Sequence, residues 1–206
     1  MTTLSPSGNT MTTDPPAPVS VPAEPESGRH FWERKHADGR PDGAKLAALR
    51  LGANREPGTV PQMWRYYTTL NHHGNMTAAL RAEHVALVLF AVHQQSQPTL
   101  MHTRGISVGK AVAGLRDSGK FSPEAVDRRF TAAATATSLN EAAHHLRGLV
   151  RQMRNLPNPQ RLDYTQLYWD LVAWQDPAKV GGIRRRWGSD YFLNRDGNGA
   201  ATPTAG

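Results

Sequence analysis

Four basic side chains in the second half of this sequence have the types and spacing of an anion-binding surface. If residues 138–154 form a helix, side chains three, four and seven positions apart lie side by side on it. This places four basic residues in one row, which we call the basic stripe: His144, Arg147, Arg151 and Arg154. Guanidinium groups fork onto phosphate oxygens, so the stripe suits the backbone of a nucleic acid. An ordinary solvated helix face is the alternative that this segment leaves open.

The segment that must position the basic stripe carries its own helix signals. Ser138 and Glu141 have the spacing of a capping box, and Pro157 lies just beyond the expected end. The face opposite the stripe is apolar and is formed by Leu139, Ala143, Leu146, Val150 and Met153. The sequence therefore predicts an amphipathic helix over 139–154.

Two more arginine clusters fall on predicted helices nearby. Arg128 and Arg129 precede the apolar Phe130, and the run Arg184, Arg185 and Arg186 precedes Trp187. Residues 104–186 contain 14 basic and 7 acidic side chains. If the clusters converge on one face, nucleic acid should bind with an affinity that falls as salt concentration rises. If they scatter, they are solvated surface.

The charge balance places the positive charge in the part of the chain expected to fold. The sequence has 24 Lys and Arg residues, 19 of them arginine, against 17 acidic residues. Three of those acids lie in residues 1–27, which contain no Lys or Arg, so the remainder has a net charge of +10. The arginine excess favours phosphate recognition, although codon bias in a GC-rich genome also explains it. We expect disordered tails at residues 1–27, which contain six prolines, and at 197–206.

Motifs for catalysis are absent from the sequence. It has no cysteine, which excludes disulfides, thiolate metal sites and a cysteine nucleophile. The pairs His72-His73 and His144-His145 point about 100° apart on a helix, so neither can hold a metal unaided. No H-E-x-x-H or G-x-S-x-G pattern occurs, and no acidic cluster is available for Mg²⁺. We expect a non-enzyme with no catalytic residues, no metal and no cofactor.

The stretch from Gly105 to Ala111 superficially matches a phosphate-binding loop. It is one residue too short, and Ala111 stands where that loop needs Ser or Thr. The stretch instead predicts a helix start capped near Ser107, with small residues allowing close packing and with Lys110 exposed.

Helical periodicity recurs from Phe31 onward, and no convincing alternating strand does, so the fold class is all-α. The polar stretch 94–104 divides the chain into an N-terminal helical part, 28–100, and a C-terminal helical bundle, 101–196. No stretch approaches the ~18 apolar residues of a membrane helix and no signal peptide is evident, so we expect a cytoplasmic protein. The expected helices span residues 30–37, 43–51, 60–71, 77–95, 105–116, 123–136, 139–154, 163–175 and 178–193.

Aromatic residues offer no base-stacking platform in the sequence. Trp169, Trp174 and Trp187 fall at spacings typical of a core. No helix-turn-helix or zinc-finger pattern appears either. Backbone contact without sequence reading is therefore favoured.

The order and spacing of several stretches resemble the CasB family, the small subunits of the type I-E CRISPR surveillance complex called Cascade. The resemblance covers about residues 44–193. It rests on Leu49-Arg50 followed by Glu56-Pro57 and Val60-Pro61, on Gly105 to Ala111, on Arg128-Arg129-Phe130 running on to Leu146 to Leu149, and on the closing stretch from Trp174 to Trp187.

The resemblance implies a non-catalytic subunit present in two copies, in contact with the backbone subunits and the large subunit. It also implies a basic surface that stabilises the R-loop formed when guide crRNA pairs with target DNA. Basic residues in the matching stretches are Arg50, Lys110, Arg128, Arg129 and Arg147. Helix geometry adds Arg151, Arg154, Arg184, Arg185 and Arg186. The alternative is a helical scaffold whose arginines pair with acidic partner proteins and make no contact with nucleic acid.

Overall fold

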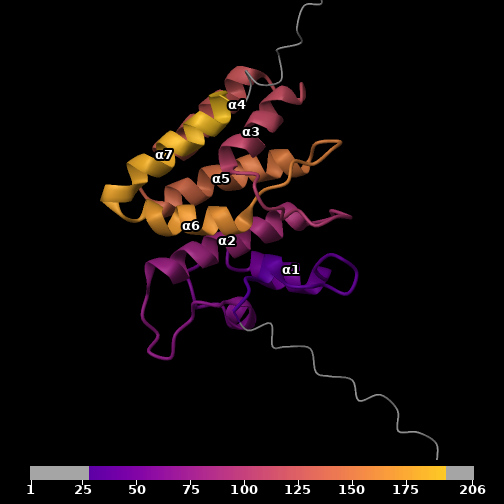
Figure 1. Cartoon of the computed structure of the whole chain (residues 1–206). Coiled ribbons are helices and arrows are strands. Elements are labelled where there is room, and N and C mark those ends of the chain that lie inside the picture. The colour runs from indigo at the N-terminus through magenta and orange to yellow at the C-terminus, as the bar shows by residue number, and fades with distance from the viewer. Residues whose placement is uncertain (1–27, 194–206) are drawn as a thin grey trace, which may run out of the picture.

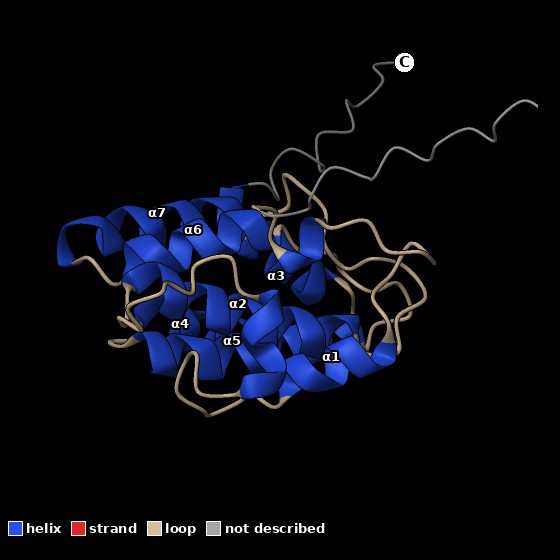
Figure 2. Cartoon of the chain, turned by 90° about the horizontal axis from the view of Figure 1, so that it is seen from below, coloured by secondary structure: helices blue, strands red, loops and turns tan. Residues whose placement is uncertain are grey.

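The computed structural model describes residues 28–193, and within this range the chain is helical (Figures 1 and 2). No strand forms among these residues; a single isolated bridge joins His102 to Leu162. The all-α prediction is confirmed, whereas the predicted tails at 1–27 and 197–206 lie outside the described residues. The elements are η1 (Phe31–Glu33), α1 (Gly43–Arg50), η2 (Pro61–Tyr66), α2 (Ala78–Gln94), α3 (Val108–Asp117), α4 (Pro123–Thr135), α5 (Leu139–Arg154), α6 (Tyr164–Trp174) and α7 (Pro177–Phe192).

Local sequence signals set most helix starts. The side chains of Thr77, Ser122 and Asp163 each accept a hydrogen bond from a backbone N–H of the first turn of the helix that follows. Ser138 does the same for α5 and accepts from the N–H of Glu141 at 3.2 Å. These caps explain why the expected starts of α2, α4, α5 and α6 lie within one residue of the observed ones, whereas α3 begins three residues after the expected start at 105.

Two expected helices are wrong in length. Residues 30–37 and 60–71 form only the short 3-10 helices η1 and η2. The reason is tertiary for η2: the buried carboxylate of Glu83 accepts the backbone N–H groups of Thr68 and Thr69 at 2.9 Å. These N–H groups are held outside a helix, and the chain turns to an extended conformation at Tyr67.

Helix α2 is the centre of the molecule, as its apolar circumference predicts. Every residue from Ala82 to Gln94 is buried. Helix α1 packs on one side of α2 and helices α5 and α6 on the other; α3, α4 and α7 lie beyond them (Figure 1). One hydrophobic cluster runs through all these layers, from Phe31 to Tyr191. The proposed boundary near residue 100 stays a prediction, and the core is shared across it.

Candidate nucleic-acid interface

The basic stripe lies on α5, opposite the apolar face of that helix. Its members differ in exposure and in the hydrogen bonds that they form. His144 and Arg151 are exposed, whereas Arg147 and Arg154 are half-buried. Arg147 donates to the side-chain oxygen of Asn54 at 3.0 Å. Arg154 donates to the backbone oxygen of Val92 at 3.0 Å and so ties α5 to the end of α2. The stripe is therefore partly a set of interhelical contacts and partly free surface.

The arginine run on α7 likewise contains residues that are bound within the protein and one that is not. Arg185 is exposed. Arg186 forms an ion pair with the buried carboxylate of Asp170 on α6. Arg184 donates to the backbone oxygen of Ala136 at 2.8 Å, and its guanidinium lies 5.3 Å from the Trp174 ring centroid. Arg186 is also exposed, but Arg185 is the one of the three that forms no hydrogen bond or ion pair within residues 28–193.

The remaining predicted basic residues sit at the surface. Lys110, Arg128 and Arg129 are exposed, and Arg50 is half-buried at the end of α1. Ser107 caps α3 as predicted and Lys110 follows on the exposed side. These residues lie on α1, α3 and α4, and α3 packs against α4.

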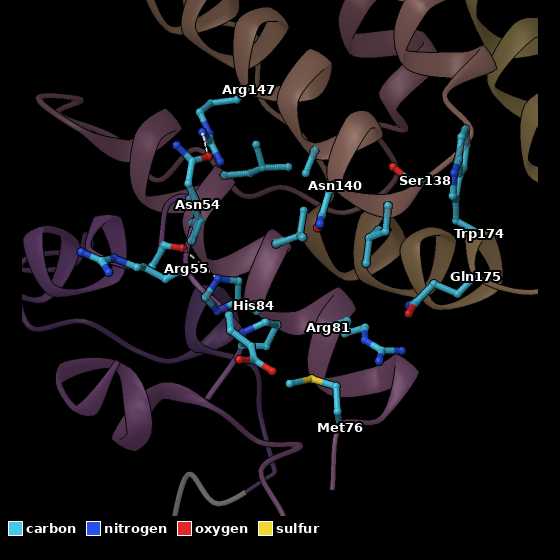
Figure 3. Close-up of a pocket in the computed structure, with 18 of the residues that line it drawn as sticks. Asn54, Arg55, Met76, Arg81, His84, Ser138, Asn140, Arg147, Trp174 and Gln175 are labelled. Atoms are coloured by element: carbon cyan, nitrogen blue, oxygen red, sulfur yellow. Dashed lines mark hydrogen bonds between the residues drawn. The ribbon is translucent and has the colours of Figure 1, made fainter. Parts of the chain in front are cut away.

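A cavity of about 980 Å³ brings together two of the predicted residues, Arg147 and Arg184. It lies between residues 52–57, α2, the start of α5 and the junction of α6 with α7 (Figure 3). Arg55 and Arg81 also line it, and Glu56 is the one acidic residue among its lining residues. Sequence reasoning missed both arginines. Arg81 did carry a signal, since it is the one Lys or Arg between Leu80 and Gln94 in an otherwise largely apolar stretch.

The guanidinium groups of this cavity have spare hydrogen-bonding capacity. The Nε atoms of Arg147 and Arg184 are buried and have no hydrogen-bond partner among the described residues. A buried N–H without an acceptor costs about 1–3 kcal/mol. Burial, followed by repulsion from Arg151, lowers the pKa of Arg147. An anion in the cavity would offset the charge repulsion on Arg147.

His84 adds no positive charge to the cavity at neutral pH. Its Nε2 lies 2.9 Å from the backbone oxygen of Gly52 and its Nδ1 lies 2.6 Å from the Tyr67 hydroxyl. These bonds suit a neutral ring that donates from Nε2 and accepts at Nδ1. Burial lowers the pKa of His84, in agreement with that form. The residue fixes the 52–57 segment against α2, and the charge comes from the arginines.

The model of one protein family, the CRISPR-associated protein Cse2, matches residues 45–192. The chain belongs to the Cse2 family. CasB from Thermobifida fusca is 29% identical in sequence, with a TM-score of 0.59 over 72% of this chain and 84% of that one. M. ruber CasB is 21% identical, with a TM-score of 0.59 over 77% and 89% of the two chains. Comparison with curated protein sequences finds no match.

A further structural match to the Cse2-family chain comes from a solved CRISPR RNA-guided surveillance complex. The matching chain is 24% identical, with a TM-score of 0.55 over 75% of this chain and 87% of that one. At this identity the match, like that to M. ruber CasB, concerns the fold.

One aromatic expectation for the Cse2-family chain is wrong. Trp174 and Trp187 are buried as predicted, but Trp169 is 57% exposed. The buried face of α6 uses positions spaced three and four apart, and position 169 falls outside it. The apolar residues of that face are Tyr164, Leu167, Tyr168, Leu171 and Trp174.

The described part of the Cse2-family chain lacks two kinds of feature. Residues 28–193 contain no group of three or more His, Asp or Glu side chains that could hold a metal ion. None of the helices in this range combines the length and apolar character needed to span a membrane.

Proposed function

We propose that this chain is the non-catalytic small subunit of a type I-E CRISPR surveillance complex, Cascade, in antiviral defence. The observation that carries the proposal is the Cse2 family match over residues 45–192. In the proposed complex it contacts the large subunit, the backbone subunits and a second copy of itself, in the cytoplasm. Guide crRNA and target DNA are its nucleic-acid partners.

The proposed physical role is contact with the nucleic-acid backbone. Formation of an R-loop exchanges one duplex for another of similar stability, so protein contacts to the backbone can tip the balance. The strongest candidates for such contacts are exposed and form no ion pair within residues 28–193: Lys110, Arg128, Arg129, Arg151 and Arg185. Arg50, Arg147 and Arg184 complete the proposed surface. Arg154 and Arg186 join helices within the fold, so they should contribute less to nucleic-acid binding.

The intramolecular bonds of Arg154 and Arg186 favour a second candidate function. In it the chain is a helical scaffold, and its remaining arginines pair with acidic surfaces of partner proteins. Such a scaffold would support the complex without touching nucleic acid.

Retention of DNA by the full chain at increasing salt concentration separates the two functions. Phosphate binding predicts that the logarithm of affinity falls with the logarithm of salt concentration, by about 0.7 per phosphate on a single strand or 0.9 on a duplex. Retention that does not change with salt would leave the scaffold as the function.

A further inference from the structure

Apolar and basic side chains line the cavity beside Arg147 together. The apolar ones include Val85, Val88 and Leu89 of α2, Ala143 of α5 and Val180 of α7. The basic ones include Arg81, Arg147 and Arg184, and Figure 3 shows Arg81 and Arg147 at different ends of the lining. In Figure 3, the Arg55 guanidinium points away from the other labelled side chains, so it belongs to the rim. A ligand that fills this space needs a negative group and an apolar body.

Two of these guanidinium groups are already held in place. Arg147 is bound to Asn54 through Nη1, and Arg184 is bound to the Ala136 carbonyl and stacked on Trp174. Their Nε–H groups are buried and lack a partner among the described residues. Because the side chains are ordered before binding, little conformational entropy remains to be lost when an anion arrives.

The apolar lining residues offer a surface for a flat ring. Amide side chains stand beside it, since Asn140 and Gln175 both line the cavity (Figure 3). The Gln175 nitrogen donates to the backbone oxygens of Ala78 and Leu171, which fixes the side chain. The volume of about 980 Å³ is at the upper end of the range for small-molecule sites and can hold more than one nucleotide.

We propose that this cavity receives an unpaired nucleotide of a single strand, with the base against the apolar lining residues and a phosphate on one of the lining arginines. The inference rests on the proposed function, because formation of an R-loop leaves one strand unpaired. A base in an intact duplex cannot enter, since it stays stacked and paired. An acidic peptide also offers negative groups, but an unpaired nucleotide joins a phosphate and a flat apolar ring in one residue.

Single strands with and without bases test the proposal on the full chain. The probes are a fluorescent oligothymidine and a strand of equal length built from abasic sites, which has the same phosphates. We expect the oligothymidine to bind roughly tenfold more tightly, because contacts to bases contribute measurably to single-strand affinity. Equal affinities for the two strands, both dependent on salt, would overturn the cavity proposal and leave the proposed function intact.

A bulky substitution that fills the cavity provides a second test of the proposal. Val180→Trp should abolish the preference for bases while backbone binding remains salt-dependent. Ala178→Trp is the matched control, because Ala178 lies on the same helix, is exposed and does not line the cavity. A preference that survives Val180→Trp in a folded variant contradicts the proposal.

An exposed substitution covers the case in which Val180→Trp does not fold. Arg81→Gln removes one cavity cation at the surface, so the fold should persist. We expect it to weaken single-strand binding more than Arg161→Gln, an exposed arginine outside the cavity. Equal effects of the two would overturn the proposal.

Binding of an acidic peptide tests the alternative ligand of the cavity. An oligo-aspartate peptide that binds in a manner blocked by Val180→Trp, while no single strand binds, would assign the cavity to a protein partner. That result would overturn the proposed nucleic-acid function together with the cavity proposal.

Discussion

The guanidinium of Arg186 on α7 forms an ion pair with the carboxylate of Asp170 on α6. Asp170 is 1% exposed and also accepts a hydrogen bond from the Trp187 ring at 2.6 Å. Burial raises the pKa of Asp170, and its hydrogen bonds and Arg186 oppose that shift. The pair therefore holds a buried charge between two helices.

Removing one partner of this pair should destabilise the fold. We expect Arg186→Gln to lower the free energy of unfolding by about 2 kcal/mol, because the buried carboxylate loses its counter-charge. Arg185→Gln, on an exposed neighbour, should change it by less than about 0.5 kcal/mol. Urea denaturation of both variants provides the measurement. Equal midpoints would mean that the pair contributes no net stability.

The close approach of α3 to α7 predicts a large effect of one methyl group. A β-carbon at Gly109 would overlap the Trp187 carbonyl oxygen and lie 2.7 Å from the β-carbon of Asp190. Gly109→Ala should therefore cost about 1–3 kcal/mol, as overpacking does. Gly148→Ala is the matched control in α5, where a β-carbon meets nothing within 4 Å, and it should stabilise by about 0.5–1 kcal/mol. Thermal unfolding should show shifts of opposite sign.

Stability should fall as pH drops below 6.5 because of His93. Burial lowers the pKa of this residue to about 4, and its Nδ1 lies 3.0 Å from the Tyr164 hydroxyl. The unfolded chain takes up a proton near pH 6.5 while the folded chain resists, so stability present above pH 6.5 is lost progressively towards pH 4. The full loss from this group is about 3 kcal/mol. His84, whose pKa is also lowered, acts in the same direction.

Denaturation midpoints at pH 7, 6 and 5 check this expectation. His93→Gln should be less stable at pH 7 but show a shallower decline with acidity. The exposed His72 supplies the control, and His72→Gln should follow the wild type. If the denaturation midpoint of His93→Gln falls with pH as steeply as that of the wild type, other groups cause the loss of stability in acid.

The basic stripe should separate into binding and structural members. In the assembled complex, Arg151→Ala should weaken retention of target DNA, because its exposed charge is free to meet a phosphate. Arg154→Ala should instead lower stability, since it removes the bond to Val92. Alanine preserves the helix in both cases. Salt-dependent target binding and thermal unfolding distinguish the two effects, and identical target binding by Arg151→Ala and wild type would count against the stripe.

Sequence alone was sufficient for the elements whose signals are local. The Ser138 cap, the alternation of apolar and basic residues along α5 and the apolar circumference of α2 predicted the bounds of α5 and α2 within one residue. Short-range hydrogen bonds and helical periodicity determine these features, so neighbouring residues suffice to find them. The family resemblance likewise followed from short stretches in a fixed order.

Tertiary structure alone decided which arginines are free and which are held. Arg186 is paired because α6 brings Asp170 to it, and Arg81 joins Arg147 because α2 and α5 pack together. Trp169 lies outside the core because α6 uses a different face. Each outcome depends on contacts between residues far apart in the chain, which spacing along one helix does not encode. For that reason the sequence identified a basic protein, and the fold located its cavity.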